Sequence, residues 1–378
     1  MIPAASARAS EARAPLRTRF LFRVCVLAAA LAAPCIAQPI TFSELLQTEE
    51  SMIRPPRTAG NAAWAYIKAW DTLPTDDDAR NKFARAIGER PKPGAKLTNE
   101  QREQLALHRA YIDGLLHATS MDHCDWGPGW EHGMLLLLPH LGQLRNSTRA
   151  LGLDARRCAE DGSSSAAAER VAAMFRMSAH ASTDAIVISS LVGCAIGYYA
   201  SIITDELIQQ DQLTPTAART IRHALRQVRT KDIYNAGAAI DNERRIVVDW
   251  LRRECQGPDA GKFLAQHLSI FEEHPMILGI DSREVLFFMD ETAIGAGLDR
   301  AERYFDAVER AWNKPAPIAS LEELELEARE GQFGLIAAAI AHSYVPIRRT
   351  CENVERTFER LDRRLSVIIE QADAAPRE

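Results

Sequence analysis

The stretch AIVISSLVGCAIGYYASIIT, residues 185–204, decides the fold. It places twenty uncharged residues in a row between Asp184 and Asp205. That length fits a membrane-spanning helix, which needs about 20 apolar residues, and Gly193 and Gly197 have the GxxxG spacing found where membrane helices pack together. Both flanks are acidic, however, and no Lys or Arg lies close enough to set an orientation across a membrane. Because a helix that is apolar on every side also fits the centre of a large helical protein, we expect a buried core helix, with a membrane span as the alternative.

Helical periodicity dominates the sequence on both sides of this stretch. Apolar residues recur at spacings of three and four, and no segment alternates apolar and polar residues for long enough to predict a strand. The helices that we expect cover about residues 98–117, 139–160, 163–175, 214–229, 236–255, 259–270, 283–312 and 320–330. The sequence therefore predicts an all-α fold, an array of antiparallel helix pairs built either as an α-solenoid or as an irregular bundle.

Several expected helices carry local signals for where they start or break. Thr98 and Gln101 have the spacing of a capping box, in which each side chain hydrogen-bonds to the other residue's backbone N–H. Pro139 fits the first turn of a helix, where its missing N–H costs nothing. The Gly295-Ala-Gly297 triplet should bend or break the helix at 283–312, because glycine weakens a helix.

The C-terminal helix has the most regular pattern. Its apolar residues follow a 4-3 spacing over three heptads, as in a coiled-coil seam: Ile347, Cys351, Val354, Phe358, Leu361, Leu365 and Ile368. Because three heptads are short for a coiled coil, we expect the seam to pack on its own chain, and a homodimer through residues 347–368 is the alternative. On another predicted helix, a basic strip is expected to be a solvated face: Arg219, Arg222, Arg226 and Arg229.

Residues 1–37 have the pattern of a secretory signal peptide. Five arginines precede the uncharged run Val24–Ala33, and Cys35-Ile36-Ala37 places small residues at the −3 and −1 positions of a cleavage site. We therefore expect export to a periplasmic or extracellular location. The membrane is expected as a partner only if this segment stays uncleaved.

Cleavage after Ala37 would leave residues 38–378, which we expect to form a single helical domain with a candidate sub-boundary at the connector 313–319. The leader carries five arginines and Glu11, a net charge of +4, so the mature chain has a net charge of −6 − 4 = −10. This acidic balance argues against a nucleic-acid partner.

Five cysteines follow the expected leader: Cys124, Cys158, Cys194, Cys255 and Cys351. Export permits disulfides, but the number is odd, so at least one thiol stays free or pairs between chains. A chain of this length folds without disulfides, and we expect most of these cysteines to be buried small apolar side chains. The sequence leaves their pairing open.

The densest group of metal-ligand side chains lies in the region 113–140. Asp113 and His117 are one helical turn apart, and His123 and His132 follow in a segment rich in Trp and Gly. Imidazole and carboxylate groups bind zinc and other first-row metals, so these four residues are the candidate ligands of a divalent metal. No HExxH or other zinc spacing is present, and we favour a cofactor-free structural role for this segment.

Other catalytic motifs are absent from the sequence: it contains no GxSxG, GxxxxGK[ST] or GxGxxG. The favoured interpretation is therefore a non-enzymatic module that binds a protein or peptide in a groove between packed helices. A metal-dependent hydrolase centred on residues 113–140 is the first alternative. A membrane-associated structural protein is the second.

Two resemblances accompany these patterns. One helical hairpin is similar to a single tetratricopeptide repeat, without further copies at that period: Leu151, Ala155, Gly162, Ala167, Val171 and Met174. Over roughly residues 98–210, the chain also resembles a family of uncharacterised, exported, all-helical bacterial proteins, through Asp125-Trp126-Gly127, Leu138-Pro139-His140-Leu141, Arg145, Gly162 and Leu191-Val192-Gly193. This resemblance implies export and a helical fold, and it supplies no catalytic residue. We interpret its first two segments as a structural motif: Asp125, Trp126, Gly127, Pro139 and His140.

Overall fold

The uncharged stretch forms the core of helix α9 (Val187–Gln209) in the computed structural model. The helix is long and apolar enough to cross a membrane, yet 67% of its most apolar window is buried inside the chain. The structure describes residues 41–46, 52–89, 94–268, 276–277, 280–340 and 344–374. The expected signal peptide, residues 1–37, lies outside them, and residues 38–378 form one compact unit.

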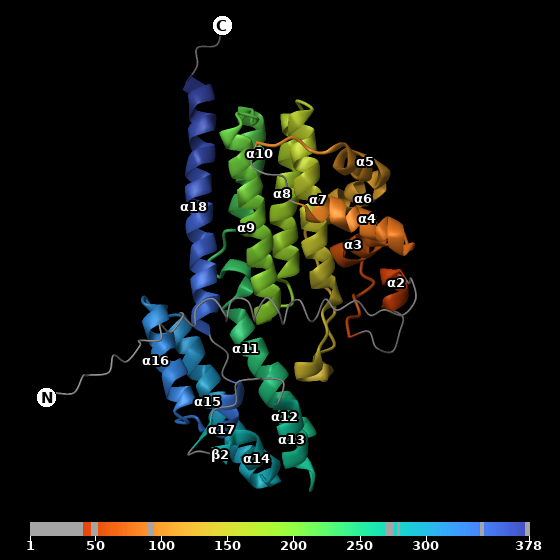
Figure 1. Ribbon diagram of the computed structural model, residues 1–378. Coiled ribbons are helices and arrows are strands. Elements are labelled where there is room, and N and C mark those ends of the chain that lie inside the picture. Colours follow the sequence, from red (N-terminus) through yellow and green to blue (C-terminus); the bar gives the residue numbers. More distant parts are fainter. Residues whose placement is uncertain are drawn as a thin grey trace, which may run out of the picture. The chain divides into compact units, whose positions relative to one another are not determined.

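This apolar helix belongs to a bundle of five long helices. Helix α8 (Ser164–Ala181) contacts α7 (Pro139–Glu160), α9 and α10 (Pro215–Val228), and α18 (Tyr344–Ala374) packs on both α9 and α10. Short connections join α7 to α8, α8 to α9 and α9 to α10, so consecutive helices run antiparallel (Figure 1). The prediction of an all-α fold with antiparallel helix pairs is confirmed.

Smaller helices flank the bundle on its N-terminal side. Helix α3 packs on α6, α6 packs on α8, and α4 packs on α7. The elements of this part are α2 (Phe42–Leu45), α3 (Ala62–Trp70), α4 (Asp77–Gly88), α5 (Asn99–Leu107), α6 (Arg109–Thr119) and the 3-10 helix η1 (Trp130–Leu135). The helix expected at 98–117 is thus two helices, because the backbone of His108 leaves the helical region at φ −106° and ψ 35°.

The C-terminal half adds a second group of helices around α15. They are the 3-10 turn η2 (Ile233–Asn235), α11 (Ala238–Arg244), the π-helical turn η3 (Arg245–Asp249), α12 (Trp250–Glu254), α13 (Ala260–Leu268), α14 (Ser282–Phe287), α15 (Glu291–Trp312), α16 (Pro317–Arg329) and α17 (Gly334–Ile340). Two strands of two residues each, β1 (Met276–Ile277) and β2 (Ile280–Asp281), pair antiparallel between α13 and α14.

Local start signals in the sequence are confirmed, whereas the expected glycine break is wrong. Thr98 and Gln101 form the capping box, and Pro139 occupies the first helical position of α7. Helix α15 runs without interruption through Gly295 and Gly297. The predicted helix is instead divided before Asp290, between α14, which ends at Phe287, and α15, which begins at Glu291. The Asp290 side chain accepts a hydrogen bond from the backbone N–H of Ala293 and caps α15.

The apolar seam of α18 faces its own chain. The first six predicted seam residues are buried, at 0–7% exposure, against a body that includes α9, α10 and α16. At the end of the seam the buried residue is Ile369, while Ile368 is partly buried. A homodimer through residues 347–368 would therefore require α18 to leave α9 and α10.

The basic strip on α10 is largely solvated, as expected, since Arg219, Arg226 and Arg229 are exposed, but it also forms an intramolecular contact with α18. Nε of Arg222 and Nε of Arg226 donate to Oδ1 of Asp362 on α18, over 2.9 and 3.0 Å. Arg229 lies 3.9 Å from the same carboxylate, and Arg219 pairs with Asp373. Burial alone would raise the pKa of Asp362, but the hydrogen bonds from Arg226 and Arg222 outweigh it and lower that pKa.

Gly193 and Gly197 provide space for Tyr234 inside the bundle. A Cβ atom on Gly197 would overlap the Tyr234 hydroxyl and lie 2.9 Å from Cζ of Phe358 on α18. The hydroxyls of Tyr234 and Ser178 on α8 are hydrogen-bonded at 2.8 Å. The GxxxG spacing therefore lets α9 approach a buried tyrosine closely, which explains the pattern without a membrane.

Candidate functional site

Two extended segments, far apart in the sequence, pair on the N-terminal side of the bundle. Residues 52–61 lie along residues 123–129, with a bridge between Ile53 and Pro128 and another between Asn61 and His123. Backbone hydrogen bonds of 2.7 Å run from Arg54 N–H to the carbonyl of Gly127 and from Gly129 N–H to that of Met52. These bonds fix the segment that leads into helix α3.

The Asp125-Trp126-Gly127 motif joins the two extended segments by further hydrogen bonds. The Asn61 side chain accepts from the Asp125 N–H and donates to the Asp125 carbonyl, both at 2.9 Å. The Asp125 carboxylate accepts from the Gly127 N–H at 2.8 Å. Gly127 has φ +57°, and a Cβ there would overlap the carbonyl of Arg54, so only glycine fits without strain.

Trp126 anchors the motif in a buried aromatic stack. Its ring lies between that of Trp70, at a centroid distance of 5.7 Å, and that of His140, at 4.4 Å. Its indole N–H donates to the carbonyl of His180 at 3.0 Å, and Tyr66 stacks on it from α3. The motif residues Trp126 and His140 are both fully buried, so their role in the structure is to hold the loop on α7 and α8.

Two histidines in this core form buried hydrogen bonds. Nε2 of His140 lies 3.1 Å from Oδ2 of Asp184, and the Tyr66 hydroxyl lies 2.9 Å from Nδ1 of His180. Burial lowers the pKa of His180 to about 4, and burial also raises the pKa of Tyr66 well above its usual range. At neutral pH His180 is therefore a neutral ring that is hydrogen-bonded to the tyrosine hydroxyl.

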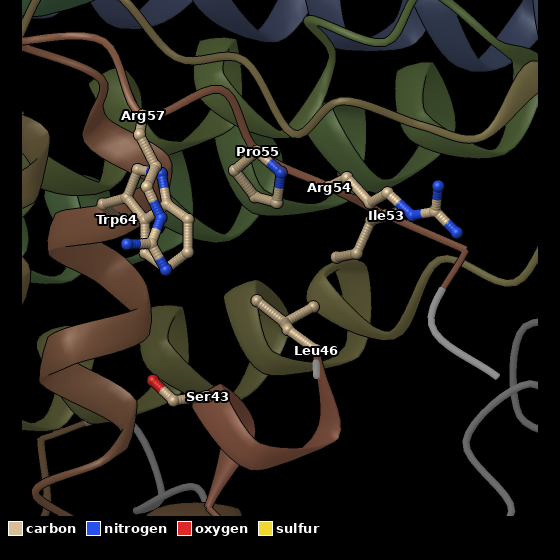
Figure 2. A pocket seen from close by; sticks show the side chains of 7 residues that line it. All are labelled: Ser43, Leu46, Ile53, Arg54, Pro55, Arg57 and Trp64. Atoms are coloured by element: carbon tan, nitrogen blue, oxygen red, sulfur yellow. The ribbon is translucent and has the colours of Figure 1, made fainter. Parts of the chain in front are cut away.

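A pocket of about 320 Å3 opens to solvent beside this paired segment. Its lining comes from α2, from residues 53–57 and from α3: Ser43, Leu46, Ile53, Arg54, Pro55, Arg57 and Trp64. Figure 2 shows Leu46 and Ile53 pointing toward one another across the opening, with Arg57 beside the Trp64 indole. The pocket therefore combines an apolar interior with cationic groups at its edge.

Contacts of Arg57, Trp64 and Ser43 outside the pocket hold its lining in place. The guanidinium carbon of Arg57 lies 5.2 Å from the ring centroid of Trp64, a cation–π contact. The Trp64 indole donates to the carbonyl of Pro56 at 3.1 Å. Ser43 hydrogen-bonds to the Asp71 carboxylate through its hydroxyl and its N–H, which holds α2 against the end of α3.

The four predicted metal ligands stand apart in the structure. Asp113 is exposed and pairs with Arg109 at 2.8 Å, and His117 is exposed on the same helix. His123 is exposed in the paired segment, while His132 lies 3.7 Å from Glu131 in η1. In the described part of the chain, no three His, Cys, Asp or Glu side chains come together as metal ligands. The metal site stays a prediction.

Comparisons with known proteins return no relatives. No family model, no curated protein and no solved structure matches the chain.

The sequence did not indicate the pocket. Its residues lie before and at the start of α3, in a part of the chain that shows no helical stripe. The one signal was Asp125-Trp126-Gly127, which marks where the pocket-lining segment is attached.

Proposed function

We propose that the chain is an exported, periplasmic or extracellular module that binds a protein or peptide in the pocket beside Trp64. The observation that supports this is the lining: Leu46, Ile53 and Pro55 supply apolar surface, and Arg54 and Arg57 supply two cations. Concave, mainly apolar pockets with a few fixed polar groups are typical of ligand sites, and Trp and Arg are among the residues that most often dominate binding energy.

The chemistry of the lining defines the ligand class. An apolar side chain of the ligand would occupy the interior between Leu46 and Ile53, and carboxylates on either side would meet Arg54 and Arg57. Arginine pairs with carboxylates in a planar, bidentate geometry, which favours acidic residues over other polar groups. We therefore expect a segment in which an apolar residue stands between Asp or Glu residues.

Panning of a short-peptide display library over the immobilised protein tests this proposal. Enriched peptides should carry the acidic–apolar–acidic pattern, and the Arg54→Glu/Arg57→Glu double variant should bind them at least about tenfold more weakly, a loss of roughly 1.4 kcal/mol. Arg360→Glu is the matched control, because Arg360 is exposed on α18 and does not line the pocket. Peptides without acidic residues, or peptides that bind the double variant as well as the wild type, would contradict the proposed site.

Export has its own test. Fractionation of cells that express the full chain, followed by N-terminal sequencing, should recover a product that begins at Gln38 outside the cytoplasm. Recovery of the intact N-terminus in the cytoplasm would remove export and leave the peptide-binding proposal standing.

A further inference from the structure

The turn η1 and the residues that follow it carry three exposed apolar side chains. Trp130, Leu135 and Leu137 are 43%, 41% and 47% exposed. They lie within eight residues of one another, so they belong to one small region of the surface, and we call these three residues the apolar patch. Large apolar side chains that gather on the surface of a protein mark contact surfaces, whereas single exposed ones need no explanation.

Contacts on the buried side of η1 hold the apolar patch in position. Gly133 has φ +52° and lies against the Trp250 ring, which a Cβ on Gly133 would overlap. Nη2 of Arg253 on α12 donates to the carbonyl of Glu131 at 2.7 Å. The η1 segment is thus attached to α12, while the apolar patch stays exposed to solvent.

Met52 connects the apolar patch to the pocket beside Trp64. Its carbonyl accepts from the N–H of Gly129, just before η1, at 2.7 Å. Its Sδ accepts from the N–H of Leu137 at 3.1 Å. The next residue of the chain, Ile53, already lines the pocket. The exposed apolar side chains and the open pocket are therefore neighbours on the surface.

Charges of opposite sign accompany these two neighbours. Arg54 and Arg57 line the pocket, whereas Glu131 follows the first residue of the apolar patch and has a side chain that is 62% exposed. A surface with a cationic pocket on one side and apolar side chains with a carboxylate on the other is complementary to a copy of itself. A two-fold rotation places each part over the opposite part of the second copy.

We propose that this surface binds a second copy of the chain in a two-fold dimer, in which the apolar patch of each copy covers the pocket of the other and Glu131 pairs with Arg54. A two-fold interface repeats each contact twice and closes at two copies. The proposal builds on the pocket of the proposed function and adds its regulation, because a second copy and a peptide compete for the same pocket.

Sedimentation equilibrium of the full chain tests the proposal by exchanging the two charges. The wild type should show a reversible equilibrium between monomer and dimer. Glu131→Arg and Arg54→Glu should each raise the dimer Kd at least about tenfold, because like charges then meet twice in every dimer. A mixture of the two single variants should dimerise again, since each contact between unlike copies then joins opposite charges.

The apolar contact is tested by a matched pair of substitutions. Leu137→Ser removes an exposed side chain of the apolar patch and should raise the dimer Kd, whereas Phe288→Ser, at a residue of 83% exposure outside the patch, should leave the Kd unchanged. A wild type that stays monomeric at every concentration, a mixture of the charge variants that stays monomeric, or a Phe288→Ser variant that is weakened as much as Leu137→Ser would overturn the proposal.

The same variants separate this proposal from the peptide-binding function. Glu131 does not line the pocket, so Glu131→Arg should separate the two copies and keep the binding of acidic library peptides. A monomeric wild type would overturn the dimer and leave peptide binding standing. Panning that enriches no acidic peptide would remove peptide binding, while the recovery of the dimer in the mixture of charge variants would still support the self-complementary surface.

Discussion

Substitution of Gly197 by alanine tests whether the close contact between α9 and Tyr234 is needed for stability. The added methyl group would overlap the Tyr234 hydroxyl and lie 2.9 Å from Cζ of Phe358. Neither ring has free space, because Phe358 is fully buried and Tyr234 is 4% exposed and hydrogen-bonded to Ser178. The structure must therefore shift to accept a single carbon atom.

The magnitude follows from three opposing effects. Alanine is favoured over glycine in a helix by about 1 kcal/mol. Overpacking of a full core costs about 1–3 kcal/mol, and loss of the hydrogen bond between Tyr234 and Ser178 costs about 1 kcal/mol more. The net expectation is a decrease of about 1–3 kcal/mol in the free energy of unfolding. Gly295→Ala is the matched control, because no atom lies within 4 Å of a Cβ there, and it should raise stability by up to about 1 kcal/mol.

Urea denaturation followed by far-UV circular dichroism measures both changes, and a double-mutant cycle isolates the contact. Tyr234→Phe removes the overlapping hydroxyl, so Gly197→Ala should cost about 1 kcal/mol less in that background than in the wild type. If Gly197→Ala instead stabilises the protein as much as Gly295→Ala does, the assigned role of this glycine is wrong.

Three further predictions concern the loop motif and two titrating groups. Gly127→Ala should lower the free energy of unfolding by at least about 2 kcal/mol, because it forces a left-handed backbone and a clash with Arg54; urea denaturation that shows no loss would contradict the fit. The folded-state pKa of His180 is about 4, below the unfolded value of about 6.5. The neutral His180 ring therefore contributes its full stability above pH 6.5, and the free energy of unfolding falls by about 3 kcal/mol as the pH drops toward 4. His180→Gln should flatten that pH dependence in urea titrations, and an unchanged slope would count against a neutral buried ring. Asp362 has a lowered pKa in the folded protein, so the stability that it contributes is present above about pH 4 and is lost as the pH falls through the folded-state pKa. The difference in unfolding free energy between the wild type and Asp362→Asn, measured by the same urea titrations, should therefore shrink over this pH range. A difference that stays constant would refute the role of Arg226.

Features that depend on residues within one helical turn were predictable from the sequence. The capping box at Thr98 and the first-turn position of Pro139 involve only neighbours along the chain, and the structure has both. The all-α fold followed from the same local periodicity. The C-terminal seam was also visible, because its apolar residues repeat on one face of one helix.

Features that depend on distant partners were not predictable. Gly297 weakens a helix in isolation, but in α15 it gives Ile336 of α17 room to pack, since a Cβ there would lie 2.7 Å from that side chain. The arginines of α10 resemble a solvated face until Asp362, more than 130 residues later, is placed beside them. Pairwise contacts of this kind leave no mark in a single sequence.

The candidate site falls in the same category. Trp126 and Gly127 were identified as a structural motif, but their partners Trp70 and Arg54 lie more than fifty residues earlier. The pocket exists because that long-range pairing positions residues 53–57 beside α2 and α3. The turn motif therefore indicated a structured loop, but not that the segment paired with this loop, residues 53–57, lines a pocket.

The order in which the ribosome makes these helices has a consequence for the nascent protein. Helix α9 ends at Gln209 and its final neighbour α18 begins at Tyr344, so 343 − 209 = 134 residues lie between them. At about 5–20 residues per second, about 7–27 seconds of translation pass before that neighbour starts to emerge. Throughout this interval one side of a helix that is apolar enough for a lipid bilayer is without its cover. A premature stop codon ahead of residue 344 would make that exposure permanent, so truncated products are candidates for aggregation and proteolysis.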